Sequence, residues 1–172
     1  CFMKNKELFS IFIRYIILVL IALPNLFLFY FIFTPLTYFP ALWFLKYFYL
    51  ENLLWYDVDG SFFVVKTLAG LTYYPSIIPA CVAGAAYYLL TILNLTTPMK
   101  ISTRIKSLIF ILSAFLIFNT VRILYFITLI IKDDFNFFDI AHTATWYFGS
   151  TVFVIILWFA NVLIFKIKTI PI

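Results

Sequence analysis

Three polar side chains in an otherwise apolar chain are of types that together support acyl transfer. Cys81 lies near the start of one apolar segment, Arg122 near the end of the next, and His142 just before the last. A cysteine thiolate attacks carbonyl carbon, an imidazole transfers protons, and a guanidinium stabilises a developing oxyanion. The sequence therefore predicts that Cys81, Arg122 and His142 form a catalytic set, provided the fold brings them together.

The composition predicts that the elements positioning these residues are membrane helices. Of 172 residues, 66% are hydrophobic, 23% are aromatic and only 11% are charged. A soluble domain of this length cannot bury so much apolar side chain. The net charge of +5 does not indicate a nucleic-acid partner, because the basic residues flank apolar segments, as in membrane proteins that keep positive charge inside. We expect one membrane-embedded domain over residues 1–172, of the all-α polytopic class.

Four segments are apolar and long enough to cross a membrane, namely residues 15–33, 79–95, 105–131 and 143–165. A helix of about 20 apolar residues crosses a hydrocarbon core of ~30 Å. Pro24 is expected to kink the first of these helices. Basic residues precede the first segment, separate the second from the third, and follow the fourth: Lys4, Lys6, Arg14, Lys100, Arg104, Lys106, Lys166 and Lys168. Both chain ends are therefore predicted to be cytoplasmic in a multi-pass protein of the cell membrane.

The stretch between the first and second segments predicts a small extracytoplasmic cap. Residues 40–55 are aromatic but interrupted by Lys46 and Glu51, which indicates an interfacial helix. A further full span is the alternative, and it would reverse the side of everything that follows. Residues 57–60 suggest a turn, and residues 61–66 and 71–78 suggest the strands of a β-hairpin.

Helix geometry predicts a shared depth for the three polar residues. Pro79 suits the first helical position, so Cys81 should lie in the first turn, among free backbone N–H groups that favour a thiolate. Arg122 should lie roughly 25 Å along the third helix, near its outer boundary, at ~1.5 Å per residue. His142 opens the fourth segment at the same boundary. Asn119 precedes Arg122 by one helical turn and is a candidate supporting residue.

Each of these residues also has a structural explanation when it is taken alone. A buried cysteine is often a small hydrophobe, an arginine near a helix end often reaches the headgroups, and a histidine often caps a helix. Asp139 either orients His142 or caps the last helix. Separate structural roles do not require a shared depth, so the shared depth favours catalysis. One histidine and one buried cysteine make no metal site, and we expect neither metal nor cofactor.

The other cysteine, Cys1, opens the chain without a preceding methionine. We expect the N-terminus to be incomplete, and a processed lipoprotein cysteine is the less favoured alternative, since no signal segment supports it. Two cysteines are too few for a disulfide framework.

At its three polar residues the chain resembles the exosortase/archaeosortase family of membrane-embedded cysteine transpeptidases. The resemblance extends from about residue 34 to residue 165. It depends on Ala-Cys-x-Ala-Gly at Cys81, on Asn-x-x-Arg-Ile at Arg122, and on His142 before the last helix. Family members commonly have Cys-Ser-Gly or Cys-Thr-Gly, whereas here Gly84 comes one position later. The chain is small for the family and looks closest to its archaeal members.

The resemblance implies substrates that are secreted proteins with a C-terminal motif, one membrane helix and a basic tail. The enzyme would cut near the motif through a thioacyl intermediate and transfer the new C-terminus to an acceptor, a membrane lipid in archaeal systems. Cys81 is then the nucleophile, His142 the proton carrier and Arg122 the oxyanion donor at the extracytoplasmic face. Asn119 would hold Arg122 or the peptide.

Two other functions stay open from the sequence. A membrane cysteine protease would use the same residues but release its product to water. A non-enzymatic polytopic assembly protein would need none of the three for chemistry, so replacement of Cys81 would have no effect.

Overall fold

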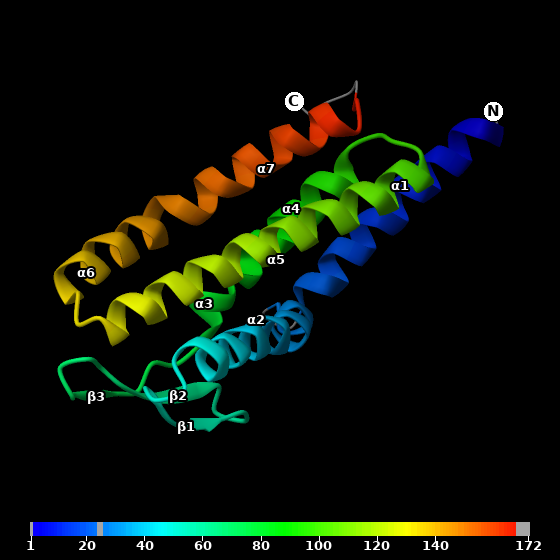
Figure 1. Cartoon of the computed structure of the whole chain (residues 1–172). Coiled ribbons are helices and arrows are strands. Elements are labelled where there is room, and N and C mark those ends of the chain that lie inside the picture. Colours follow the sequence, from blue (N-terminus) through cyan, green and yellow to red (C-terminus); the bar gives the residue numbers. More distant parts are fainter. Residues whose placement is uncertain (1, 24–25, 168–172) are drawn as a thin grey trace.

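The structure is a computed structural model that describes residues 2–23 and 26–167, and 72% of it is helical. Figure 1 shows the elements in chain order. They are α1 (Phe2–Ala22), α2 (Phe27–Phe48), β1 (Leu53–Asp57), β2 (Phe62–Lys66), β3 (Thr72–Tyr73), α3 (Pro79–Val82), α4 (Gly84–Thr96), α5 (Ile101–Ile131), α6 (Phe135–Ala144), a π-helical turn (Thr145–Gly149) and α7 (Ser150–Ile164). The predicted mostly helical class and the predicted β-hairpin are confirmed.

Three helices are long and apolar enough to cross a membrane: Phe27–Phe48, Pro79–Thr96 and Ile101–Ile131. Two shorter apolar helices, Ile11–Leu20 and Ser150–Ile164, add to them. The four predicted spans therefore do not match the helices one for one.

The predicted first span was wrong in its boundaries. Residues 15–33 do not form one helix, because α1 ends at Ala22 and Leu26 adopts a left-handed conformation (φ 61°) before α2 begins. The predicted kink at Pro24 lies outside the described residues.

The separate interfacial helix predicted over residues 40–55 was also wrong. Most of that stretch is the second half of α2, which continues through Pro35 and Pro40. Lys46 lies in the last turn of α2, where the helix dipole favours a cation, so this charge marks a helix end and not an interruption. Residues 53–55, predicted as the end of that helix, belong to strand β1.

Helix α5 passes through the centre of the bundle and is apolar on opposite faces. One face packs against the other helices with side chains that recur every four residues: Ile111, Phe115, Asn119, Ile123 and Ile127. Another stripe with the same spacing is exposed: Ile105, Ile109, Ile117, Val121 and Tyr125. A helix that is apolar all round is a core helix or a membrane span. Because one stripe is exposed, lipid is the environment that suits it.

The three strands form an antiparallel sheet in the order β1-β2-β3, with a register shift between Leu53 and Trp55. Phe63 of β2 is fully buried, and the Tyr38 ring of α2 stacks on it with centroids 4.8 Å apart. The Tyr38 hydroxyl donates a hydrogen bond to the Asp57 carbonyl oxygen at 3.0 Å. These contacts fix the sheet to α2.

A second attachment joins the sheet to the end of α5. The Leu68 N–H donates to the Ile131 carbonyl oxygen at 2.9 Å, and the Ala69 N–H donates to Asp133 Oδ2 at 2.8 Å. Asp133 has a positive φ of 60°, so the chain turns sharply here before α6. The sheet is thus held from two sides over the helix ends.

A polar cluster joins three helices at the other end of the bundle. Asn94 Nδ2 of α4 donates to Ser107 Oγ of α5 at 2.8 Å, and Ser107 Oγ donates to Asn161 Oδ1 of α7 at 2.9 Å. The Arg104 guanidinium donates to three carbonyl oxygens at the end of α4, those of Asn94, Leu95 and Thr97. Backbone carbonyl oxygens at a helix end lack intrahelical donors, and the Arg104 guanidinium supplies the missing hydrogen bonds.

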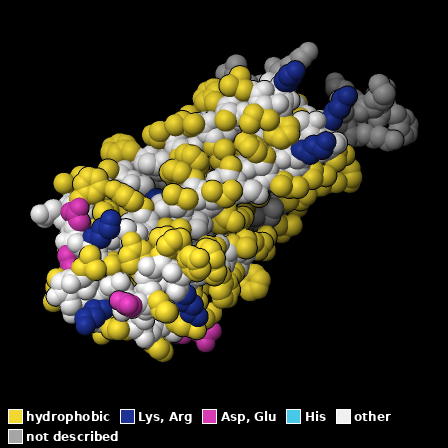
Figure 2. Space-filling model, viewed as in Figure 1, with side chains coloured by type: hydrophobic (Ala, Val, Ile, Leu, Met, Phe, Trp, Pro, Cys, Tyr) yellow, Lys and Arg dark blue, Asp and Glu magenta, His cyan; other side chains and the backbone are white. Residues whose placement is uncertain are grey.

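Charge differs between the two ends of the molecule. Six acidic residues lie in or beside the sheet and α6: Glu51, Asp57, Asp59, Asp133, Asp134 and Asp139. Among the side chains that Figure 2 colours, those at this end include both acidic and basic ones, whereas the opposite end shows lysine and arginine alone. Yellow apolar side chains cover the surface between the two ends.

Candidate functional site

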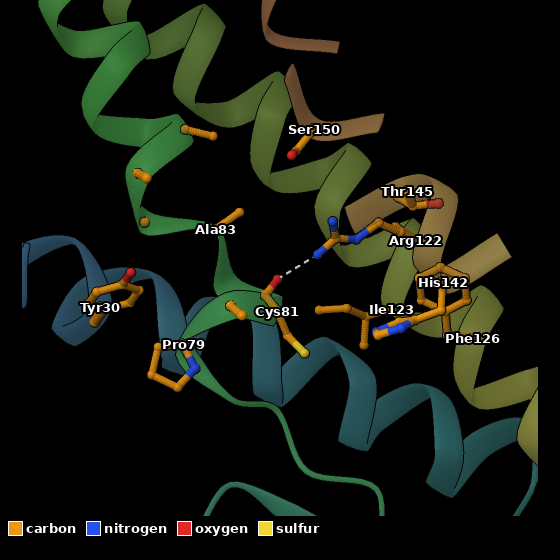
Figure 3. A pocket seen from close by; sticks show the side chains of 14 residues that line it. Tyr30, Pro79, Cys81, Ala83, Arg122, Ile123, Phe126, His142, Thr145 and Ser150 are labelled. Carbon is orange, nitrogen blue, oxygen red and sulfur yellow. Dashed lines mark hydrogen bonds between the residues drawn. The ribbon is translucent and has the colours of Figure 1, made fainter. Parts of the chain in front are cut away.

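The three predicted polar residues line one cavity of about 250 Å³. Cys81 comes from α3, Arg122 from α5 and His142 from α6 (Figure 3). The wall is completed by α2, the first turn of α4, the π-helical turn and the start of α7. Asn119 is buried behind this wall and contacts the Cys81 backbone. Four residues predicted from three separate segments therefore lie around one point.

Cys81 lies in a single helical turn, and not in the first turn of a continuous span as the sequence predicted. Pro79 is at the predicted first position, but Ala83 is left-handed (φ 59°, ψ 45°) and α4 starts only at Gly84. The Cys81 N–H donates to the Ile78 carbonyl oxygen at 2.8 Å, so it is not a free donor. The thiol itself is half-buried and unoxidised.

The break between α3 and α4 places small residues against the cavity. A left-handed non-glycine residue costs about 1–2 kcal/mol, so packing must hold Ala83 there. A Cβ atom on Gly84 would lie only 2.7 Å from Cε1 of Tyr30, so only glycine lets this ring approach. Gly84, Ala85 and Ala86 then line the cavity with the positive end of the α4 dipole.

The Cys81 carbonyl oxygen is held by two side chains of α5. Asn119 Nδ2 donates to it at 3.0 Å. Arg122 Nη2 donates to it at 2.9 Å, the bond drawn as a dashed line in Figure 3. Asn119 Nδ2 also reaches the Val82 carbonyl oxygen at 3.3 Å. A one-turn helix leaves its carbonyls without intrahelical partners, and α5 supplies the missing donors. The sequence predicted that Asn119 and Arg122 share a face but did not predict that they position the Cys81 backbone.

One N–H group of Arg122 has no hydrogen-bond partner among the described residues. This group is the buried Nε–H. Buried donors are normally satisfied, so this unpaired N–H is an exception, and the guanidinium that carries it lines the cavity. Ser150 and Thr145 line the same cavity.

The sequence predicted that His142 opens the final long helix. Instead, His142 lies in the last turn of α6. The predicted span over residues 143–165 is interrupted by the π-helical turn, and α7 begins at Ser150. The imidazole stacks on Phe138 with centroids 5.3 Å apart and meets Phe126 edge to face at 5.3 Å. These two rings fix its orientation. In Figure 3 it extends from α6 toward the side of the cavity that holds the Cys81 sulfur.

The N-cap of α6 is Asp134, whose carboxylate accepts from the Phe137 N–H at 3.3 Å. The capping role considered for Asp139 is therefore wrong. Asp139 is exposed on α6.

Sequence reasoning missed three cavity residues, Tyr30, Thr145 and Ser150. Tyr30 was assigned to the last turn of a continuous span, whereas in the structure it lies near the start of α2 and contacts Gly84. Thr145 begins the π-helical turn and Ser150 follows it, and no sequence pattern indicated this turn. Single-turn π-helices are frequent at functional sites, because they reorient a few side chains within a helix.

A second cavity of about 230 Å³ adjoins the first and is lined by Phe63 of β2 and the loop before α3. Cys81 and His142 line both cavities. The remaining walls are apolar apart from Ser76: Phe63, Pro75, Ile77, Ile123, Phe126, Ile127, Ile130 and Phe138.

Within the described residues, no three His, Cys, Asp or Glu side chains gather in a way that would hold a metal ion. No protein-family model, curated protein or solved structure matches the chain. Chemical reasoning about the site therefore rests on its geometry: a thiol, an imidazole and a guanidinium around one cavity.

Proposed function

We propose that the protein is a membrane-embedded cysteine transpeptidase that processes C-terminal sorting signals of secreted proteins. One observation carries this proposal: Cys81, Arg122 and His142 come from three separate elements and line one cavity. Independent structural roles for a thiol, a guanidinium and an imidazole give no reason for such a meeting.

The residues are suited to the following reaction. The His142 imidazole takes the Cys81 thiol proton, and the sulfur attacks the carbonyl carbon of the scissile peptide bond. The C–N bond breaks, the leaving amine receives the proton from His142, and the substrate's new C-terminal acyl group stays on sulfur as a thioester. An acceptor amine or hydroxyl then attacks this thioester, passes its proton to the sulfur and releases Cys81.

The negative oxygen that forms in each step needs hydrogen-bond donors. The Arg122 guanidinium, which lines the cavity, is one source of donors, and the N–H groups at the start of α4 are further candidates. Removal of one such donor typically lowers kcat by about 100- to 1,000-fold. Asn119 is a positioning residue, since it acts on the Cys81 and Val82 carbonyl oxygens and not on the substrate.

The membrane arrangement fits a substrate that carries its own helix. We place the acidic, sheet-bearing end outside the cell and the basic end inside, following the positive-inside bias. The substrate helix would lie beside the exposed apolar stripes with its basic tail at the basic end. The cavity walls are largely apolar and limit water, which favours transfer to an acceptor, with a membrane lipid as the candidate, over hydrolysis.

Processing of a sorting-signal protein in cells tests this proposal. A secreted protein from the same genome, ending in a short motif, a membrane helix and a basic tail, is co-expressed with the enzyme. Cys81→Ala should abolish its cleavage, because no other described side chain supplies a thiol to the cavity. Cys1→Ala is the matched control and should cleave normally.

The mass of the product separates the three candidate functions. Transfer adds the mass of the acceptor to the new C-terminus, whereas hydrolysis adds water alone. Normal cleavage by Cys81→Ala, at normal protein level, would leave only a non-enzymatic role.

A further inference from the structure

The second cavity shares Cys81 and His142 with the first but differs from it in character. Arg122, Thr145 and Ser150 line the first cavity only, whereas the second is walled by the apolar underside of the sheet, α5 and α6. The thiol therefore lies between a partly polar space and an apolar one.

We infer that the apolar cavity binds one bulky apolar side chain of the substrate next to the scissile bond. This inference rests on the proposed transpeptidase function and adds a specificity pocket to it. A carbonyl held at the Cys81 sulfur has a side chain one or two bonds away. That side chain enters a space that adjoins the thiol, and the apolar cavity adjoins it through Cys81 and His142.

The size of the cavity suits a single ring. A cavity of about 150 Å³ lined by aliphatic and aromatic side chains binds benzene. The 230 Å³ beneath the sheet is therefore enough for the side chain of phenylalanine or leucine. Apolar pockets with few polar groups are the usual means of selecting such side chains.

The side chains that line the apolar cavity are held in place by packing and hydrogen bonds. Phe63, Ile77 and Ile127 are buried in the core, and the loop after β2 is attached to the end of α5 by the Leu68 and Ala69 hydrogen bonds. A fixed apolar pocket discriminates by size, and one methylene more or less changes selectivity by about 10- to 200-fold.

Thiol chemistry measures the pocket without any peptide substrate. Benzyl and methyl methanethiosulfonate each transfer their organic thiol group to Cys81, forming a mixed disulfide and releasing methanesulfinate. The rates are compared in the full-length Cys1→Ser protein, and each rate is divided by that of free cysteine. The ratio of benzyl to methyl rates should be at least about tenfold, because the apolar cavity receives the ring.

Filling the pocket should remove this preference. Ile130→Trp places an indole in the apolar cavity from α5, and Ser76→Trp does so from an exposed position on the loop before α3, with little demand on the core. Either variant should bring the ratio to about one while the methyl rate stays within about twofold. Ile117→Trp, on the exposed stripe of α5 and lining neither cavity, is the matched control and should keep the preference. Comparison of variants with the same two reagents cancels their different partitioning into detergent or lipid.

The outcomes separate this inference from the proposed function. A ratio that is near one in the Cys1→Ser protein, or that survives both tryptophan variants, overturns the pocket even if sorting signals are processed. A preference lost in Ile130→Trp and Ser76→Trp supports the pocket even if no processing is found, in which case the transpeptidase function alone fails.

Discussion

The Arg122 side chain has contacts that suit two tasks. Its Nη2 donates to the Cys81 carbonyl oxygen at 2.9 Å, while its buried Nε has no partner among the described residues. The hydrogen bond to Cys81 holds the turn that carries the thiol. The remaining N–H groups of the guanidinium are available to the substrate oxygen. The planar guanidinium reaches both directions at once, which a lysine ammonium on a flexible stem does not.

Arg122→Lys should therefore lower processing of the sorting-signal substrate by about 100-fold, in the range found for loss of an oxyanion donor. The positive charge remains, so the loss measures the fork and not the charge. The measurement is the processed fraction against time, at matched protein level. Near-normal processing would mean that Arg122 only anchors the helix at the headgroups, because lysine does this equally well.

Arg104 offers a matched control at the opposite end of the bundle. It is buried against the carbonyl oxygens at the end of α4. That end of the bundle is opposite the one where the Cys81 cavity lies. Arg104→Lys loses the same fork, so it should lower the thermal midpoint of the purified protein. The rate of processing per folded molecule should stay within about twofold.

At the scale of elements, the site depends on interruptions of helices. Ala83 separates α3 from α4, the π-helical turn separates α6 from α7, and Leu26 precedes the start of α2. The sequence predicted the apolar segments and a common level for Cys81, Arg122 and His142, which line one cavity, because helical rise and hydropathy are local properties. It did not predict the breaks at Ala83 and residues 145–149. Neither position carries a proline, and the contacts that accompany the first break, such as Tyr30 on Gly84, come from distant parts of the chain.

The sheet is the second element whose role could not be derived from local pattern. Two of its strands were predicted from residue type, but its attachment to α5 uses hydrogen bonds between residues more than 60 positions apart in sequence. The apolar cavity exists only because of that attachment. Its lining could therefore not be listed from the sequence, although Cys81 and His142 were.

Removing the Asp133 carboxylate should loosen this attachment. Asp133→Gly keeps a residue that accepts the positive φ of 60° but loses the acceptor for the Ala69 N–H. A hydrogen bond to a charged group contributes about 1.5–3 kcal/mol, and exposure reduces it, so amide exchange at Ala69 should accelerate about fivefold. Asp133→Asn keeps a side-chain acceptor and should change exchange by less than about twofold. Equal exchange in the two variants would show that the carboxylate does not hold the loop.

At the scale of the whole molecule, charge and apolar surface define an axis. Acidic side chains gather at the sheet end, basic ones dominate the other, and exposed apolar stripes such as that of α5 lie between them (Figure 2). Composition alone predicted a membrane protein, and three helices have the length and hydropathy to cross a bilayer. The number of spans was harder to predict, because α2 continues through two prolines that normally end a helix.

Thiol labelling in intact cells measures the orientation of this axis. In a Cys1→Ser, Cys81→Ala background, Asp59→Cys should react with a membrane-impermeant maleimide, because Asp59 is exposed in the turn between β1 and β2. Ser102→Cys, exposed at the start of α5, should react only after the membrane is permeabilised. The reverse pattern would place the Cys81 cavity on the cytoplasmic side and exclude secreted proteins as substrates.

Detection of the thioacyl intermediate on Cys81 tests the proposed transpeptidase most directly. Membranes that contain the enzyme and its sorting-signal substrate are quenched in acid during turnover, digested and analysed by mass spectrometry. The peptide that contains Cys81 should carry, as a thioester, the substrate peptide that ends at the new C-terminus. Neutral hydroxylamine should release the substrate peptide as a hydroxamate and regenerate the thiol. Ongoing processing with an unmodified Cys81 peptide at every time point, together with undiminished processing by Cys81→Ala, would contradict the proposal.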